Sequence, residues 1–354
     1  KYYIIFIMEF IEFFAGIDDE NRRFDKVIRK MTEKSNISSL YSAIRKGLIK
    51  LNDKKSDPST KISNGDKISI AKFLIESNKI EILSNENNKL NISSEKKLNK
   101  TSINLNKLYD KLEIIFENEF VQIINKPYNI NVHGSQEECS LTKIIEEKYK
   151  SLHKTSLSFV PGPLHRLDKK TTGLIVFSNN LIGANVFSKL ISEKKVRKFY
   201  LGICQGRIEN QQTWNNTIEK NQNNKSNFFT MKINSAIKSI NQNQLNYATT
   251  ICTPLSYGKY KNNEITLCQY EIITGKKHQI RLQSSFHGHP LLGDTAYNGI
   301  KINEKQDFFL HAYKLITEEN NQINLPKEIT ASIPQNYKDF LNQTLINYDG
   351  RLII

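Results

Sequence analysis

The chain has 354 residues, which is too long for one ordinary hydrophobic core, so we expect two or more domains. Hydrophobic residues make up 38% and charged residues 25%, which is typical of a soluble globular protein. The formal net charge of +15 indicates a polyanionic partner, nucleic acid before an anionic membrane surface. Because Lys, Asn and Ile are used heavily throughout, net charge alone is a weak argument.

The cysteine and histidine residues indicate neither a zinc site nor a disulfide framework. The cysteines are far apart and form no C-x-x-C pair, which favours reduced thiols in a cytosol-like compartment. His287-Gly288-His289 could be a metal pair, but no cysteine or carboxylate cluster supports it. We therefore expect a cytoplasmic protein without a metal. The cysteines are Cys139, Cys204, Cys252 and Cys268.

Residues 1–20 are predicted to form an N-terminal extension and a first strand. The apolar run at residues 2–8 is followed by Glu9 and Glu12, so it is too short and too interrupted for a membrane helix. It lacks a small-residue cleavage site, so we expect no signal peptide. Met8 could be the initiator, which would make residues 1–7 upstream sequence. No other stretch approaches transmembrane length, so no membrane contact is expected.

Residues 21–75 are predicted to form a small basic α/β domain. Apolar residues recur at i, i+3, i+4 and i+7 in residues 24–31, which is the spacing of an amphipathic helix. A second helix follows, which Ser38 or Ser39 can cap. The domain holds 14 Lys and Arg against 5 Asp and Glu, so it carries much of the excess charge. The expected strands are residues 48–51 and 67–70.

This arrangement resembles the S-four-type RNA-binding module, which is named after a small-subunit ribosomal protein. The matching segments are residues 23–28, 39–47, 49–52 and 65–70. The resemblance implies RNA binding through basic side chains of the domain. The alternative is a solvated basic surface with no specific partner. The candidate RNA-binding residues are Arg22, Arg23, Lys26, Arg29, Arg45 and Lys46.

A linker and a larger second domain follow. Residues 76–112 are rich in Asn, Lys, Ser and Glu, which predicts a flexible linker. Residues 113–345 are predicted to form the second domain and residues 346–354 a C-terminal tail. The many strands expected in the second domain are separated by variable helices, which favours an α+β fold with a largely antiparallel mixed sheet. Strands are expected in residues 114–124, 196–204, 248–255, 265–273 and 308–312, helices in 141–149 and 181–194, and an irregular hairpin region in 215–246.

Two polar clusters in the second domain are candidates for its chemistry. Residues 165–173 follow a Pro-Gly-Pro break and lead into an apolar strand. Asp168 lies there among several cations, which should keep its carboxylate ionised at neutral pH. Taken alone, Asp168 could also be a turn residue in an ion pair. In residues 274–282 a glycine turn places Arg281 to meet an anion, although the start of a basic surface helix has the same pattern.

Together these clusters resemble the RluA-type pseudouridine synthases, which isomerise uridine in RNA. His165-Arg166-Leu167-Asp168-x-x-Thr171-Thr172-Gly173 matches the signature of that family, and its accessory motifs follow in the right order. The basic domain ahead makes the chain most similar to the branch that modifies large-subunit ribosomal RNA, the RluC kind. The accessory motifs are Asn125-Lys126-Pro127, Lys198-x-Tyr200, Gly275-x-x-His278-Gln279-Ile280-Arg281 and Leu310-His311-Ala312.

The resemblance implies a pseudouridine synthase fold and a reaction that needs no metal, redox change or cofactor. Asp168 would be the catalytic carboxylate and Arg281 its ion-pair partner. Tyr200 would pack on the target base and help to remove the proton from ring carbon five. Arg166 would fill the space left when the uridine is flipped out, and His278 would contact the RNA. We expect a monomer.

Two other functions fit the sequence. One is a synthase acting on tRNA, and the other is a non-catalytic RNA-binding protein of ribosome assembly. The basic domain weighs against the first, and the intact set of Asp168, Tyr200 and Arg281 weighs against the second. The positions at which the sequence departs from the family pattern do not include Asp168, Tyr200 or Arg281. Thr172 stands where serine is usual, and Asn129 stands where glycine is common, a change that Asn tolerates because it can adopt the left-handed conformation.

Overall fold

The computed structural model describes residues 8–32, 36–76, 105–134, 139–152, 156–220, 231–233, 246–302, 307–319 and 321–344. Most of the predicted linker lies outside these residues. The chain divides into two compact units, and the predicted domain boundaries stay predictions. The first unit comprises Lys1–Tyr109, Ile144–Pro161 and Asn180–Ile182, and the second comprises Asp110–Lys143, Gly162–Asn179 and Gly183–Ile354. Within the described ranges, no helix is both long and apolar enough to cross a membrane.

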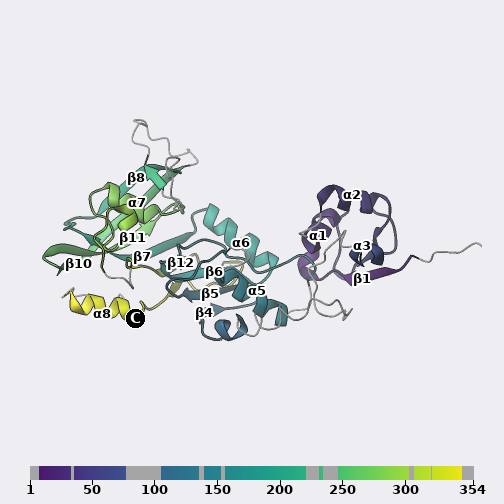
Figure 1. Cartoon of the computed structure of the whole chain (residues 1–354), viewed down its shortest axis with the longest axis horizontal. Helices are drawn as coiled ribbons and strands as arrows, with labels where there is room; N and C mark the ends of the chain where they lie inside the picture. The colour runs from purple at the N-terminus through teal and green to yellow at the C-terminus, as the bar shows by residue number, and fades with distance from the viewer. Residues whose placement is uncertain are drawn as a thin grey trace, which may run out of the picture. The chain divides into compact units, whose positions relative to one another are not determined.

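The first unit contains a three-stranded antiparallel sheet in the order β1-β3-β2 and the helices α1 and α2 (Figure 1). The predicted apolar stripe of α1 is buried, and it shares one hydrophobic core with Leu40 and Ile44 of α2 and Ile68 and Ile70 of β3. Both predicted helices of this unit are therefore confirmed. The elements are β1 Phe10–Phe14, η1 Ile17–Asp19, α1 Phe24–Met31, α2 Ile37–Arg45, β2 Ile49–Leu51, β3 Lys67–Ala71 and α3 Lys72–Glu76.

The second unit is built on a ten-stranded sheet in the order β4-β5-β6-β12-β7-β11-β10-β8-β9, with β13 paired to β12. Neighbouring strands in it are antiparallel, except that β6 and β12 run parallel. The predicted α+β class with a largely antiparallel mixed sheet is thus confirmed. The strands are β4 Glu113–Glu117, β5 Val121–Lys126, β6 Thr172–Ser178, β7 Val196–Gln205, β8 Gln212–Lys220, β9 Met231–Ile233, β10 Tyr247–Tyr260, β11 Asn263–Ile272, β12 Leu310–Thr317 and β13 Glu328–Thr330.

Helices α7 and α8 cover opposite faces of this sheet (Figure 1). Leu201 of β7 packs in one core cluster with Tyr337 of α8. Tyr270 of β11 reaches Ser284 of α7 and pairs with Tyr200 of β7. Because side chains alternate along a strand, Tyr200 faces the α7 side of the sheet. The helices beyond residue 139 are α5 Leu141–Leu152, α6 Leu181–Ser192, α7 Gln279–Phe286 and α8 Gln335–Gln343, with the short η2 Thr295–Tyr297.

Gly173 allows β6 and β12 to approach each other directly after the segment that carries Asp168. It pairs with Ala312 and has a φ of +106°, a conformation that side chains disfavour. A Cβ at this position would lie 2.2 Å from the carbonyl oxygen of Ala312. A glycine at the end of the signature motif is therefore required by the sheet.

Two local expectations differ from the structure. Helix α2 is capped by Asn36, whose side chain accepts a hydrogen bond from the Ser38 amide at 3.0 Å, and not by the hydroxyl of Ser38 or Ser39. The region expected to be an irregular hairpin begins with the regular strand β8. Trp214 and Ile218 bury their side chains there while the strand pairs with β10, so a polar sequence still forms a strand.

Candidate active site

Asp168 lies on the loop that leads into β6, and local hydrogen bonds fix this loop. The Thr171 amide donates to the Asp168 carbonyl oxygen at 3.1 Å. The Val176 amide of β6 donates to His165 Nε2 at 3.1 Å. Burial lowers the pKa of His165 to about 3, so its imidazole stays neutral and can accept this bond. The loop is thereby held against the strand that follows it.

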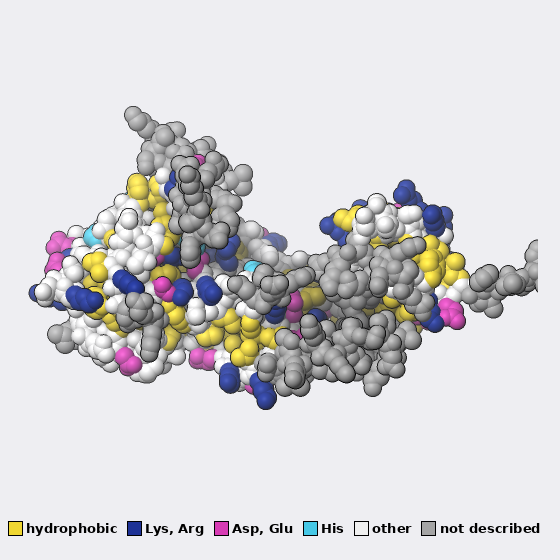
Figure 2. All heavy atoms as spheres, viewed as in Figure 1, with side chains coloured by type: hydrophobic (Ala, Val, Ile, Leu, Met, Phe, Trp, Pro, Cys, Tyr) yellow, Lys and Arg dark blue, Asp and Glu magenta, His cyan; other side chains and the backbone are white. Residues whose placement is uncertain are grey.

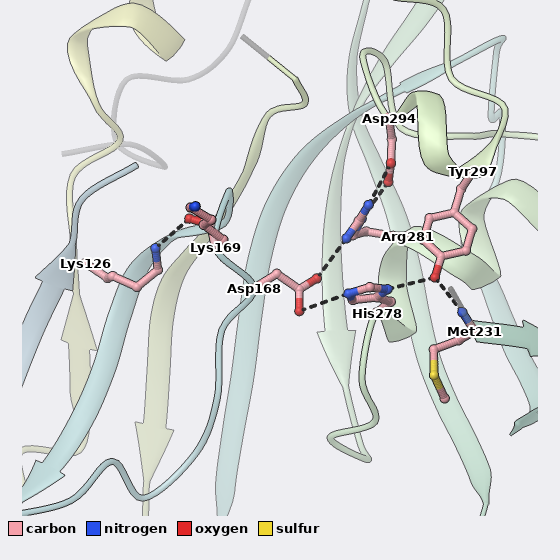
Figure 3. A network of polar contacts seen from close by, with 8 residues as sticks. All are labelled: Lys126, Asp168, Lys169, Met231, His278, Arg281, Asp294 and Tyr297. Atoms are coloured by element: carbon pink, nitrogen blue, oxygen red, sulfur yellow. Dashed lines mark hydrogen bonds and ion pairs between the residues drawn. The ribbon is translucent and has the colours of Figure 1, made fainter. Parts of the chain in front are cut away.

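Lys126 at the end of β5 holds the other side of the same loop. Its ammonium donates to the carbonyl oxygens of Pro127, Ile130 and Lys169 at 2.9, 3.0 and 3.0 Å, and the bond to Lys169 is drawn in Figure 3. The residue is fully buried. Burial lowers the pKa of Lys126 to about 7, although the negative charge of Asp168 opposes this shift. Lys126 thus links β5 to the loop beside Asp168.

Arg281 in the first turn of α7 joins two carboxylates (Figure 3). Its Nη1 donates to Asp168 Oδ2 at 3.3 Å, and its Nε and Nη2 donate to Asp294 at 2.7 and 2.8 Å. The Asp294 side chain is 2% exposed and that of Asp168 is 18% exposed. Burial opposes the charge of Arg281, but the bonds to Asp294 and both negative charges raise its pKa. Asp294 therefore fixes the guanidinium, and Asp168 is the carboxylate that is open to a ligand.

His278 faces the other oxygen of Asp168. Its backbone is left-handed, with φ 55°, and its Nε2 lies 3.8 Å from Asp168 Oδ1. Its Nδ1 lies 2.7 Å from the hydroxyl of Tyr297, which accepts a hydrogen bond from the Met231 amide at 3.0 Å (Figure 3). Burial lowers the pKa of His278 to about 4, with Asp168 opposing, so the ring is neutral at neutral pH. The network is satisfied when Tyr297 donates to Nδ1 and Nε2 carries the proton towards Asp168.

Tyr200 of β7 is buried, at 5% exposure, with its side chain on the α7 face of the sheet. Burial, followed by the negative charge of Asp168, raises the pKa of its phenol above the ordinary value. The phenol is therefore neutral at neutral pH. A neutral phenol can pack on a ring and donate a hydrogen bond, but it is a poor proton acceptor. These properties favour a packing role over the expected help in removing a proton.

One pocket of about 630 Å³ brings together the five candidate residues of the second unit. Its volume suits a ligand of nucleotide size. Asp168 is the one carboxylate among its described lining residues, which include several cations. The pocket is therefore an electropositive cavity with a single acidic group. The five candidate residues that line it are Arg166, Asp168, Tyr200, His278 and Arg281.

The other six candidate residues lie in the first unit, where Lys and Arg side chains gather around α1 and α2 (Figure 2). Two of them make hydrogen bonds to other side chains, and Arg45 Nε donates to the carbonyl oxygen of Tyr41 at 3.4 Å. Arg23 makes two hydrogen bonds to Asp25, at 3.1 and 2.9 Å, and Arg22 donates to the Ser158 hydroxyl at 2.6 Å. These bonds compete with any RNA contact by Arg22 and Arg23. The other four candidate residues, which are all exposed, are Lys26, Arg29, Arg45 and Lys46.

Sequence reasoning missed Asp294 and Tyr297, which support Arg281 and His278 from behind. Both lie in residues 289–297, which read only as a loop punctuated by Pro and Gly. The position of Asp294 directly after Gly293 was the only feature of the sequence that could have marked it as a functional carboxylate. Its pairing with Arg281, 13 residues earlier, depends on how the loop folds back beside α7.

Comparison with known proteins shows which family the chain resembles. The sequence pattern of the family described as RNA pseudouridylate synthase matches residues 121–286. An uncharacterized RNA pseudouridine synthase of Mycoplasma capricolum is 26% identical over 310 residues, which cover 86% of this chain and 90% of that protein. Ribosomal large subunit pseudouridine synthase C of Rickettsia bellii is 26% identical over 316 residues, covering 87% and 95%. Along residues 121–286 the chain is similar to the RNA pseudouridylate synthase family.

Two further comparisons place the synthase among its relatives. The tRNA pseudouridine synthase C of Vibrio parahaemolyticus is 26% identical over 211 residues, which cover 59% of this chain and 83% of that protein. The solved structure of Human RNA Pseudouridylate Synthase Domain Containing 4 matches this chain with a TM-score of 0.54 at 21% identity. The match covers 70% of this chain and 98% of that chain, which supports the fold. The predicted resemblance to the RluA-type pseudouridine synthases, with likeness to the RluC kind, is confirmed.

Proposed function

We propose that this synthase converts uridines of large-subunit ribosomal RNA to pseudouridine, with Asp168 as the catalytic carboxylate. The observation that carries the proposal is the setting of Asp168. It is the one acidic group among the described residues that line the pocket, and it faces the cation Arg281. Because Asp294 makes the two shorter bonds to Arg281, the Asp168 carboxylate remains open to a nucleotide.

The reaction rearranges one nucleotide without gain or loss of electrons. The bond from the sugar to the base nitrogen breaks, the base turns, and a new bond forms from the sugar to ring carbon five. That carbon gives up a proton, and the freed ring nitrogen takes one up. Asp168 acts in this sequence as a nucleophile or as a proton carrier.

The neighbours of Asp168 have separate roles in the proposal. Tyr200 packs its neutral ring against the target base, and His278 directs its Nε2 towards the carboxylate. Arg166 is exposed in the pocket wall, so its side chain can enter the RNA helix and fill the space of the flipped uridine. Unstacking costs a few kcal/mol, and such a replacement offsets part of it.

Ribosomal RNA is favoured as the substrate by the extent of the similarity. The relative named for the large ribosomal subunit in Rickettsia bellii matches 87% of this chain, whereas the relative named for tRNA matches 59%. We also propose that residues 21–75 are an S-four-type RNA-binding domain. Exposed cations on α1 and α2 support that role, because phosphate contacts provide most sequence-independent affinity for RNA. A cytoplasmic location and a monomeric state stay predictions.

Mapping of pseudouridines in total RNA tests the substrate. RNA is compared from cells that contain the chain, cells that lack it, and cells that carry only the Asp168→Asn variant. We expect specific sites in large-subunit rRNA to be lost in the second and third samples. Loss confined to tRNA sites would identify a tRNA synthase instead. An unchanged pseudouridine map would contradict the proposed enzyme.

A further inference from the structure

Lys198 of β7 is a buried cation that the reaction described above does not use. The residue is 8% exposed. Across the part of the chain that the structure describes, its ammonium makes no hydrogen bond or ion pair. Burial lowers the pKa of this ammonium below its ordinary value. A buried charge without a partner lowers stability, so its presence points to an anion that the folded protein binds.

The position of Lys198 shows where that anion would lie. Lys198 precedes Tyr200 by two residues on β7, so both side chains are on the same face of the sheet. Two strand residues span roughly 7 Å. Both side chains line the pocket that contains Asp168. The pocket therefore extends along β7 from the Asp168 and Tyr200 end to a second, cationic end.

The wall beside Lys198 leaves room for a ligand. Its Nζ lies 3.5 Å from the place that a Cβ on Gly275 would occupy, and Gly275 has no side chain to fill this space. Lys194, which is exposed, also lines this end of the pocket. No carboxylate from the described residues lines this end. A bound anion would therefore be attracted by Lys198 and Lys194 without repulsion from a neighbouring negative side chain.

We propose that Lys198 binds a phosphate group of the RNA, next to the uridine held by Asp168 and Tyr200. The inference rests on the proposed function, because RNA supplies phosphate as its anion. The span from Tyr200 to Lys198 is comparable with the distance from a nucleobase to the phosphate of its own nucleotide. A lysine ammonium is a compact charge that suits phosphate. Lys198 is thus a positioning residue that fixes the backbone of the flipped nucleotide.

The test compares wild type, Lys198→Met and Arg197→Met as full-length proteins. Methionine keeps most of the length of the Lys198 side chain and removes its charge. Arg197 is the matched control, since it is the next cation on β7, points to the other face and pairs with Glu271 at 2.7 Å. The substrates are unmodified transcripts of large-subunit rRNA and of tRNA. KM, kcat, the dissociation constant at several salt concentrations and the melting temperature are measured.

For Lys198→Met we expect KM to rise roughly tenfold, with kcat within about twofold of wild type. The slope of log affinity against log salt should fall by about 0.7, which corresponds to one lost phosphate contact on a single strand. The melting temperature should rise by about 2–4 °C, because an unpaired buried charge has been removed. Arg197→Met should leave KM and the salt slope unchanged.

Other outcomes overturn the inference in recognisable ways. An unchanged KM and salt slope in Lys198→Met would show that Lys198 binds no phosphate. A fall in kcat with unchanged KM would show that Lys198 carries a proton in the reaction instead. A lower melting temperature with an unchanged salt slope would indicate a structural lysine. If wild type forms no pseudouridine in either transcript, the proposed function fails and this inference fails with it.

Discussion

At the residue scale, the charge of the site depends on how Arg281 divides its hydrogen bonds. Its two shorter bonds go to Asp294 and its longest to Asp168. If the guanidinium faced Asp168 with two bonds, it would neutralise the carboxylate and block access to it. Asp294 is therefore a positioning residue that keeps Arg281 aligned while Asp168 stays available.

We predict that Asp294→Asn lowers kcat by about 10²-fold, because Arg281 then turns towards Asp168 and displaces it from its productive position. Turnover of unmodified rRNA is the measurement, with the fraction of folded protein checked by circular dichroism. Glu271→Gln is the control, since it breaks the ion pair with Arg197 elsewhere on the same sheet. A wild-type kcat in folded Asp294→Asn would show that Arg281 needs no second carboxylate.

Single residues were predictable where local chemistry decides them. Asn129 was expected to tolerate a left-handed conformation, and its φ of 64° confirms this. The ion pair of Asp168 and Arg281 was expected from the family motifs and is present at 3.3 Å. The neutral state of His278 was not predictable, because its pKa of about 4 results from burial by distant segments.

At the scale of elements, hydrophobic periodicity predicted most helices and strands of both units. It worked for α1, whose apolar stripe is buried, and for β7, whose alternation separates Leu201 from Tyr200. It failed for β8, where polar residues dominate the sequence. Pairing with β10 and burial of Trp214 outweigh the local preference there, and neither is visible in a single segment.

We predict that the exposed cations of α1 and α2 bind RNA phosphates. Replacing Lys26, Arg29 and Arg45 together with Gln should weaken binding to rRNA and lower the salt slope by about 0.7–0.9 per lost contact. The measurement is the dissociation constant for an rRNA fragment at several salt concentrations. The matched control replaces Lys54, Lys55 and Lys61, which are exposed in the same unit but lie outside α1 and α2. Equal losses in both triple variants would indicate a general charge effect without a defined RNA surface.

At the scale of the whole molecule, the order of strands could not be read from the sequence by physical reasoning alone. The sheet places β12 between β6 and β7, although β12 comes more than one hundred residues later in the chain. Such pairings depend on the complete chain, and only the family resemblance implied them. The same topology brings Asp168 from the loop before β6 to Tyr200 of β7 and Arg281 of α7.

The most direct test of the central claim compares Asp168→Asn with wild type on an unmodified large-subunit rRNA transcript. Asparagine keeps the shape of the side chain and removes its negative charge. Pseudouridine formation and the dissociation constant for the RNA are measured on the same preparations. We predict that the variant forms no pseudouridine while its affinity for the RNA stays close to that of wild type. Near-normal turnover by the variant would contradict the catalytic role of Asp168.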